Sequence, residues 1–465
     1  MVKRRDFLGA AGAGVTGSLL AGSRAAVGQT GTGLAAPSGG SASLFLPEDD
    51  LQPATYDRLP LEWNKARVAS LTEKLREEGI DGILLTDRWN IIYFTGLWHS
   101  TTERLFYVFF PTRKPEPIWF YPSLDRDLVT SWWYGDGDMY FDWHHAKGAF
   151  PEQEKVQMGA KVDLWERTLK GLKRRGYAGK KLAVDRELTP SAQKEVVRIL
   201  GGETSSSAQT CLDMRIRKTD EEQALWRRAY IIFNKVHAYA RDLLLEHGTD
   251  LTDFDIASAA TRYGTDLIME GIRRDGRPHS AVGIRMGVSC RVGPGTGFPH
   301  PNQFHHNPVR QGQALQIAGG IRIGGCGGEL YRAFLIHPWT DHMKKVWTIS
   351  RDCTQIQKEE SIAGVTCSTV AYKIHKYQVE NGMAPYIYHR PGHGEGTEGH
   401  QAPYLALGDH TMLEPGMAFS VEPGLYDPEN GFGVNWSDDY FIRPQGPARQ
   451  MSRLPWSEDW CLVKL

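Results

Sequence analysis

The chain has 465 residues, which is long enough for two domains with sizeable cores. It carries 54 Lys and Arg residues against 55 Asp and Glu residues, so its net charge is −1 at pH 7 with histidine neutral. This balance excludes the strongly basic surface that favours nucleic acid or an anionic membrane. The 6 cysteines are scattered and show no CxxC spacing, which predicts buried free thiols in place of a zinc site or a disulfide scaffold.

The first residues have the features of a processing signal. Arg4 and Arg5 form a twin-arginine pattern, and an apolar run over residues 9–21 follows that is too short and too glycine-rich to anchor in a bilayer. We therefore expect residues 1–28 to be a twin-arginine signal peptide. The mature protein would be periplasmic or secreted, with no membrane attachment after processing.

A linker is expected next, over residues 29–56. Its part from 30 to 43 is rich in Gly, Ser and Ala, which predicts a disordered tether.

Helical and strand patterns alternate over residues 57–210. Apolar residues at helical spacing predict helices over 63–78, 161–175 and 191–200, and short apolar runs predict strands over 80–85, 105–110, 117–121 and 181–185. This alternation favours an α/β domain in which helices pack on a mixed sheet.

A second domain is expected over residues 211–465. It opens with a long helix from Asp220 to Glu246, capped by Thr219 or Asp220 and ending at Gly248. Further helices are predicted over 253–262, 343–360 and 368–381, and glycine-rich strands over 281–288, 314–317 and 331–336.

Two short tracts near the C-terminus combine polar residues with strand-like sequence. In residues 391–396 (PGHGEG), His393 lies between glycines, and His400 follows seven residues later. In residues 416–426, Glu422 ends an apolar strand just before Pro-Gly. These features indicate a polar site set into a sheet, with His393, His400 and Glu422 as catalytic candidates.

This pair of tracts resembles the C-terminal half of the aminopeptidase P, prolidase and creatinase family, which has the pita-bread fold. Residues 215–229 resemble the entry into that family's catalytic domain, and residues 79–96 resemble the first strands of its N-terminal domain. The resemblance implies an α/β (α+β) protein with a creatinase-type N-terminal domain and a C-terminal pita-bread domain. It also implies a homodimer.

In the metal-dependent members of this family, two aspartates, one histidine and two glutamates hold two divalent ions. The resemblance places Ala318 and Glu329 on the aspartates, His393 and Glu422 on the histidine and the first glutamate, and Ser437 on the last glutamate. Alanine has no donor atom and serine is a poor neutral ligand, so a second ion would lack ligands. We expect either no metal or a single Mn, Fe or Zn ion held by Glu329, His393 and Glu422.

Creatinase is similar in fold yet works without metal, with histidine as acid and base and with glutamates that bind a cationic substrate. The chain matches it at His393 and Glu422 but has Tyr331 and Tyr404 where creatinase binds the guanidinium and carboxylate groups of creatine. Creatine is therefore not the expected substrate. The candidates for substrate binding are Glu329, Tyr331, Tyr404 and Glu395.

Other polar residues leave alternatives open. The family carries a pocket histidine just before the strand at 314, and either His300 or His306 could be its equivalent as a further catalytic residue. Glu395 and Glu398 add negative charge to the motif loop, where they could favour a cationic or zwitterionic substrate or be ordinary solvated carboxylates.

Together these features predict an exported enzyme acting on a small cationic or amino-acid-like molecule. Histidine and glutamate would serve as acid and base in hydrolysis of a C–N bond or in an elimination. One alternative is an Xaa-Pro peptidase with a remodelled single-metal site. Another is a non-catalytic, peptide-binding module, because a fold does not fix a function.

Overall fold

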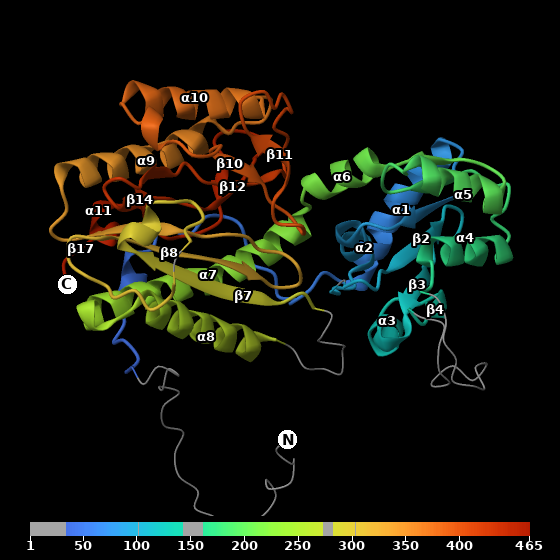
Figure 1. Cartoon of the computed structure of the whole chain (residues 1–465), viewed down its shortest axis with the longest axis horizontal. Helices are drawn as coiled ribbons and strands as arrows, with labels where there is room; N and C mark the ends of the chain where they lie inside the picture. The colour runs from blue at the N-terminus through green and yellow to red at the C-terminus, as the bar shows by residue number, and fades with distance from the viewer. Residues whose placement is uncertain (1–33, 101, 143–160, 273–281, 303) are drawn as a thin grey trace, which may run out of the picture.

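The computed structural model describes residues 34–100, 102–142, 161–272, 282–302 and 304–465, and these form two lobes (Figure 1). The predicted signal peptide lies outside the described residues. No helix in the described part of the chain is long and apolar enough to cross a membrane. All six cysteines are buried free thiols, as predicted.

As far as it is described, the N-terminal lobe is built on a six-stranded mixed sheet with the order β4-β3-β2-β1-β5-β6. Its strands are β1 (Gly82–Leu85), β2 (Tyr107–Pro111), β3 (Ile118–Pro122), β4 (Asp136–Tyr140), β5 (Leu182–Val184) and β6 (Thr204–Ser206). Its helices are α1 (Leu61–Glu77), α2 (Arg88–Thr95), α3 (Arg126–Thr130), α4 (Leu164–Arg174), α5 (Pro190–Leu200) and α6 (Ala208–Ile216). Ile83 and Leu85 face a core shared with α1 and α2, and Leu84 faces the core shared with α4 and α5. Burial on both faces explains why β1 is apolar throughout.

In the described residues, the C-terminal lobe contains a four-stranded sheet (β17-β9-β8-β7), a five-stranded sheet (β11-β10-β12-β15-β16) and the hairpin β13-β14. The strands are β7 (Arg285–Val292), β8 (Ala314–Arg322), β9 (Arg332–Ile336), β10 (Gly392–Gly394), β11 (Gln401–Leu405), β12 (Ala418–Val421), β13 (Leu425–Asp427), β14 (Phe432–Val434), β15 (Asp439–Phe441), β16 (Arg449–Gln450) and β17 (Leu462–Val463). Helix α7 (Asp220–His247) packs along β8, and α8 (Asp253–Gly271) packs along β7. Helix α9 (Asp341–Glu360) packs near β9 and β14, and α10 (Cys367–Glu380) packs near β11. The short helix α11 (Glu458–Cys461) precedes β17. The predicted fold class is confirmed.

The predicted helices and strands are present, and most of their ends move by a few residues, but α8 continues to Gly271 although its predicted end is 262. The start of α7 is fixed by a capping box between Thr219 and Glu222, which satisfies backbone N–H groups at the helix start. Strand β8 runs on to Arg322, beyond the predicted end at 317, because Gly319 and Gly320 stay paired with β7. Gly319 and Gly320 are therefore part of the sheet.

Residues 41–58 form a strap along the C-terminal lobe before the chain enters the N-terminal lobe. Ser41 is buried, and its backbone N–H donates to Asp242 Oδ1 at 3.0 Å. The backbone N–H of Leu46 donates to Arg453 O at 2.7 Å, and that of Ala54 to Ala224 O at 2.9 Å. The prediction of a disordered tether up to residue 43 is wrong in its last part, since backbone pairing and the buried polar contact of Ser41 hold this segment.

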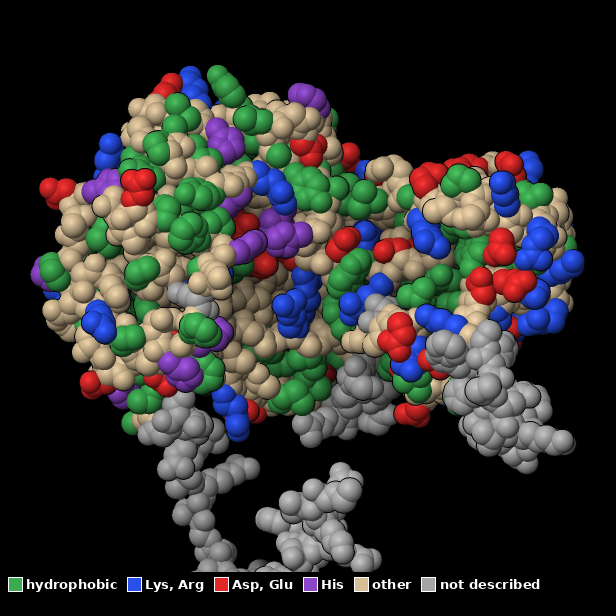
Figure 2. Space-filling model, in the orientation of Figure 1, with side chains coloured by type: hydrophobic (Ala, Val, Ile, Leu, Met, Phe, Trp, Pro, Cys, Tyr) green, Lys and Arg blue, Asp and Glu red, His purple; other side chains and the backbone are tan. Residues whose placement is uncertain are grey.

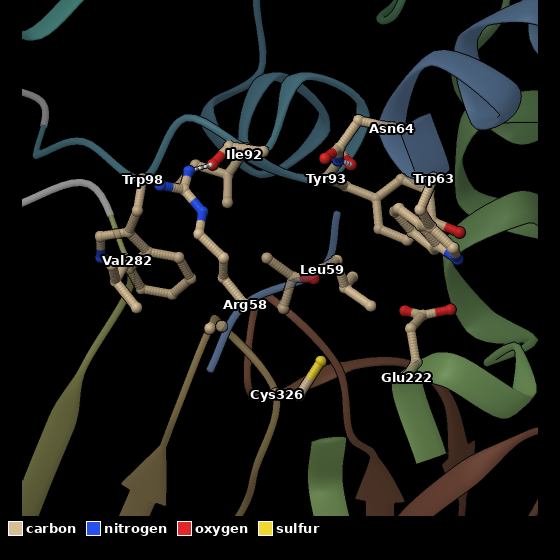
Figure 3. A pocket seen from close by; sticks show the side chains of 14 residues that line it. Arg58, Leu59, Trp63, Asn64, Ile92, Tyr93, Trp98, Glu222, Val282 and Cys326 are labelled. Carbon is tan, nitrogen blue, oxygen red and sulfur yellow. Dashed lines mark hydrogen bonds between the residues drawn. The ribbon is translucent and has the colours of Figure 1, made fainter. Parts of the chain in front are cut away.

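The strap ends at the junction of the lobes, beside a cavity of about 40 Å³ (Figure 3). Arg58 donates to Gly96 O at 3.1 Å, and its guanidinium lies 3.7 Å above the Trp132 ring. Glu222 of α7 and Cys326 also line the cavity. A space of this size suits a water molecule and is too small for an organic substrate.

Arg332 supports the hairpin that carries Glu329. Its side chain is only 1% exposed, and its guanidinium donates to Asp438 Oδ2 at 3.0 Å and to Leu454 O at 2.8 Å. A buried carboxylate that loses its guanidinium partner keeps its desolvation cost without compensation.

We predict that Arg332→Met lowers the free energy of unfolding by about 3–5 kcal/mol. Urea unfolding followed by circular dichroism measures this change. The control Arg262→Met removes an exposed ion pair with Asp266 and should stay within about 0.5 kcal/mol of the wild type. Equal effects of the two substitutions would contradict the structural role of Arg332.

Candidate active site

The candidate site lies in a hollow beside the junction of the two lobes, where histidine, acidic and basic side chains gather (Figure 2). The hollow contains a cavity of about 570 Å³. Trp89 and Trp98 line it from the N-terminal lobe, and Glu329, Tyr331 and His400 line it from the C-terminal lobe. The C-terminal lobe also contributes glycines of β7 and β8, which leave bare backbone at the cavity wall.

His393 lies on β10, and its ring is 2% exposed. Its Nδ1 is 3.1 Å from Gly394 O and therefore carries the proton, so Nε2 has the free lone pair. Among the described residues, Nε2 is buried without a hydrogen-bond partner. Burial, reinforced by the charge of His400, lowers the pKa of His393 to about 4. The imidazole is thus neutral at physiological pH and available as a base.

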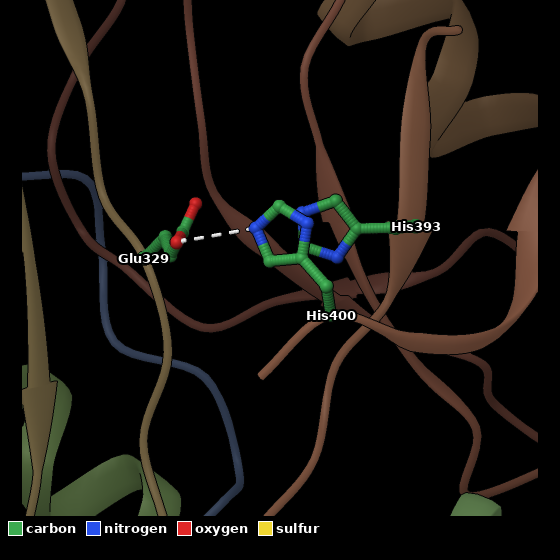
Figure 4. A group of neighbouring side chains, drawn as sticks. All are labelled: Glu329, His393 and His400. Atoms are coloured by element: carbon green, nitrogen blue, oxygen red, sulfur yellow. Dashed lines mark ion pairs between the residues drawn. The ribbon is translucent and has the colours of Figure 1, made fainter. Parts of the chain in front are cut away.

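His400 stacks on His393, with ring centroids 3.7 Å apart and planes inclined by 18° (Figure 4). It precedes β11, and its Nε2 lies 3.7 Å from Glu329 Oε1. The ion pair with Glu329 raises the pKa of His400 although partial burial opposes the charge. The raised pKa of His400 favours the charged form of its ring and the lowered pKa of His393 favours the neutral form, since protonation of one stacked ring disfavours protonation of the other.

Glu329 and Glu422 form a second unequal pair. Burial opposes the charge of Glu329, but the ion pair with His400 and the hydrogen bond from Tyr331 lower its pKa to about 2. The Tyr331 hydroxyl donates to Glu329 Oε2 at 2.8 Å. Burial and the negative charge of Glu329 raise the pKa of Glu422 well above its ordinary value. A protonated Glu422 therefore faces the lone pair of His393, with Glu422 Oε2 at 3.6 Å from Nε2.

Glu395 lies behind His393 and does not line the cavity. It is fully buried, it accepts from Arg322 Nη2 at 2.7 Å, and its Oε2 is 3.8 Å from His393 Nδ1. Burial raises the pKa of Glu395 to about 7, although the Arg322 guanidinium favours the carboxylate. Glu398 accepts from Arg215 at 3.0 Å. The expected substrate-binding role of Glu395 is not supported, because both motif-loop carboxylates are matched by arginines.

The remaining candidates lie farther out. Tyr404 is opposite His393 in the register of β11 and β10, and it is 36% exposed. His300 and His306 are exposed in the loop between β7 and β8 and are absent from the described cavity lining. The ring of His306 packs on Phe254, 4.3 Å away. These positions do not support a catalytic role for His306 or for His300. Burial lowers the pKa of His389, and His300 is near enough to add to this effect.

Sequence reasoning missed His389 and Tyr426. His389 Nδ1 lies 2.7 Å from Arg390 O and its Nε2 lies 2.9 Å from the Tyr426 hydroxyl. Nδ1 therefore donates to the carbonyl, and Nε2 accepts from the tyrosine. His389 could have been noticed because it precedes the His393 motif by four residues, whereas the partnership with Tyr426 depends on the sheet.

The side chains suit one metal ion at most. Donor atoms of Glu329, His393 and His400 lie within 4.8 Å of one another, so this cluster contains His400 in place of the expected Glu422. The stacked rings cannot both direct in-plane lone pairs at one point, so an ion bound to Glu329 and His393 would draw on Glu422 or require His400 to turn. A second ion would lack ligands at these positions, because the Ser437 hydroxyl is hydrogen-bonded to that of Ser420 at 2.8 Å and Ala318 has no donor atom.

Comparisons with known proteins agree with this fold. Residues 224–444 match the model of metallopeptidase family M24, and residues 67–216 match that of the creatinase/prolidase N-terminal domain. The Xaa-Pro dipeptidase of Lactobacillus delbrueckii subsp. lactis is 25% identical over 372 residues, covering 78% of this chain and 90% of that protein. The Xaa-Pro dipeptidase of Lactobacillus helveticus is 23% identical over 394 residues, covering 81% and 94%.

Solved structures show the same architecture. The Xaa-Pro dipeptidase from Bacillus anthracis superposes with a TM-score of 0.66 at 20% identity, covering 86% of this chain and 100% of that one. The dipeptidase PepE from Mycobacterium ulcerans superposes with a TM-score of 0.68 at 19% identity, covering 88% and 100%.

The fold and the site thus define a two-domain hydrolase of the pita-bread class. The chain belongs to the aminopeptidase P, prolidase and creatinase family, with an M24 catalytic domain behind a creatinase-type N-terminal domain.

We predict that the protein binds no more than one Mn, Fe or Zn ion per chain. Elemental analysis after loading and gel filtration measures the ratio, and Glu329→Gln should reduce it because the substitution removes an anionic ligand. Two tightly held ions per chain would contradict the ligand assignment.

Proposed function

We propose that the protein hydrolyses a C–N bond of an amide in a small amino-acid-like substrate, with His393 as general base and Glu422 as general acid. The observation that carries this proposal is the unpaired Nε2 of a neutral His393, 3.6 Å from the carboxyl group of Glu422. A base and an acid held in opposite protonation states at neutral pH are what amide hydrolysis needs.

In this scheme a water molecule attacks the substrate carbonyl carbon and gives one proton to His393 Nε2. A C–O bond forms as the C–N bond breaks, and Glu422 protonates the leaving nitrogen. The products are a carboxylic acid and an amine. The proton on His393 then passes to the ionised Glu422, and this transfer restores the starting protonation state of both residues. The protonated His400, stacked on His393, offers positive charge to the oxyanion that develops on the carbonyl oxygen.

The charge of the site favours an amino-acid-like substrate over a strongly cationic one. The expectation of a cationic substrate depended in part on free negative charge at Glu395 and Glu398, and these are matched by Arg322 and Arg215. Glu329 is the ionised carboxylate that remains at the centre; it forms an ion pair with His400 and accepts a hydrogen bond from Tyr331. The dipeptidase names of the relatives support an amide of this size.

A second candidate is an Xaa-Pro peptidase with a single metal ion, favoured by the clustering of Glu329, His393 and His400. A bound ion would polarise the substrate carbonyl and lower the pKa of a water molecule. Turnover of Xaa-Pro dipeptides that disappears with chelator and returns with one equivalent of Mn would select this candidate over the metal-free reaction.

We also propose that the protein is exported and forms a homodimer. The twin-arginine pattern supports export, and the family resemblance supports the dimer. Loss of export after changing Arg4 and Arg5 to lysine is the result that the first of these proposals requires.

We predict that His393→Ala and Glu422→Gln each lower kcat by about 100-fold to 10,000-fold, because each removes one partner in proton transfer. Turnover of dipeptides and N-acetyl amino acids, measured with and without chelator, gives the rates. The control His410→Ala changes an exposed histidine outside the site and should leave kcat unchanged. Activity within a few-fold of wild type in either site variant would move the chemistry to other residues.

A further inference from the structure

We propose that Arg390 binds the carboxylate group of the substrate and thereby selects molecules with a free acidic end. This proposal rests on the proposed function, because it names the substrate class of the same site. It also differs from the sequence-based expectation, in which no arginine was assigned to a substrate carboxylate.

The backbone around Arg390 is fixed against the site. The N–H of Glu422 donates to Pro391 O at 2.7 Å, and the side chain of His389 is bonded to the Tyr426 hydroxyl at 2.9 Å. Arg390 lies between these two anchored residues and three residues before His393. Its side chain is exposed, so it begins beside the catalytic groups and extends into solvent.

The guanidinium is held by stacking. Its central carbon lies 4.4 Å from the centroid of the Tyr404 ring, and Tyr404 is the residue opposite His393 in the sheet. A guanidinium that stacks on an aromatic face keeps its N–H groups at the edge, where they can bind a carboxylate with two hydrogen bonds. Stacking also reduces the conformational freedom that such binding would otherwise remove.

Charge distinguishes Arg390 from its neighbours. Arg322 and Arg215 also lie near the motif loop, but they are bonded to Glu395 and Glu398. In the part of the chain that the structure describes, Arg390 forms no ion pair. Its positive charge nevertheless reaches the site, because it partly opposes the rise that burial and Glu329 produce in the pKa of Glu422.

The catalytic pair and Arg390 together define the class of substrate. An amide carbonyl would lie at His393 and Glu422, and a carboxylate on the same small molecule would meet Arg390. Dipeptides and N-acyl amino acids with a free C-terminus fit this description, whereas their C-terminal amides do not.

The test compares acids with their amides. Isothermal calorimetry on the full chain would use glycyl-proline against glycyl-prolinamide and N-acetylalanine against its amide. We expect the wild type to bind each acid about 10-fold to 100-fold more tightly than its amide, as a charge-assisted bidentate contact implies. Arg390→Gln should abolish this preference, and Arg390→Lys should keep part of it. The matched control Arg113→Gln changes an exposed arginine of the N-terminal lobe and should keep the full preference.

The outcomes separate this inference from the proposed reaction. Binding of the acids that depends on Arg390, without any hydrolysis, would sustain the inference and refute the reaction. Equal affinity for acid and amide in the wild type, an unchanged preference in Arg390→Gln, or no binding of either acid would overturn the inference.

Discussion

The stacking of His393 on His400 is the contact on which the chemistry of this protein depends. Two imidazoles 3.7 Å apart cannot both be protonated without strong repulsion, so any feature that stabilises charge on one ring keeps the other neutral. Glu329 stabilises the charge on the more exposed ring of His400. Burial keeps the charge off His393. Burial, together with the same Glu329 charge, makes Glu422 retain its proton, so one ionised carboxylate acts on the protonation of two neighbours, His400 and Glu422.

The two sheets of the C-terminal lobe bring these groups together. Glu329 comes from the hairpin between β8 and β9, whereas His393, His400 and Glu422 come from β10 and its neighbours in the other sheet. Arg332 links the two sheets through its contact with Asp438, next to β15. The pairing of β10 with β12 within one sheet therefore sets the spacing between His393 and Glu422, and the packing of the two sheets sets the position of Glu329.

The fold and the candidates His393 and Glu422 could be predicted from the sequence because short local motifs indicate them. Glycines on either side of His393 and the Pro-Gly after Glu422 are readable without knowledge of the fold. The position of Glu395 could not be predicted, since its burial depends on Arg322, a residue of the other sheet. By its position in the sequence, His306 was as good a candidate for the pocket histidine as His300, but its ring packs on Phe254 of α8. The burial of Ser41 in the strap could not be predicted either, because its partner Asp242 is far along the chain.

The protonation state of the two stacked histidines tests this account most directly. Nuclear magnetic resonance of protein with ¹⁵N-labelled histidine, assigned with His393→Ala and His400→Ala, reports the proton on each ring nitrogen as pH changes. The account predicts that His393 stays neutral from pH 8 to pH 5 with its proton on Nδ1, since its pKa is about 4. It predicts that His400 gains its proton at a pH above the ordinary histidine value. Titration of His393 near pH 6.5, or a proton on its Nε2, would contradict the account.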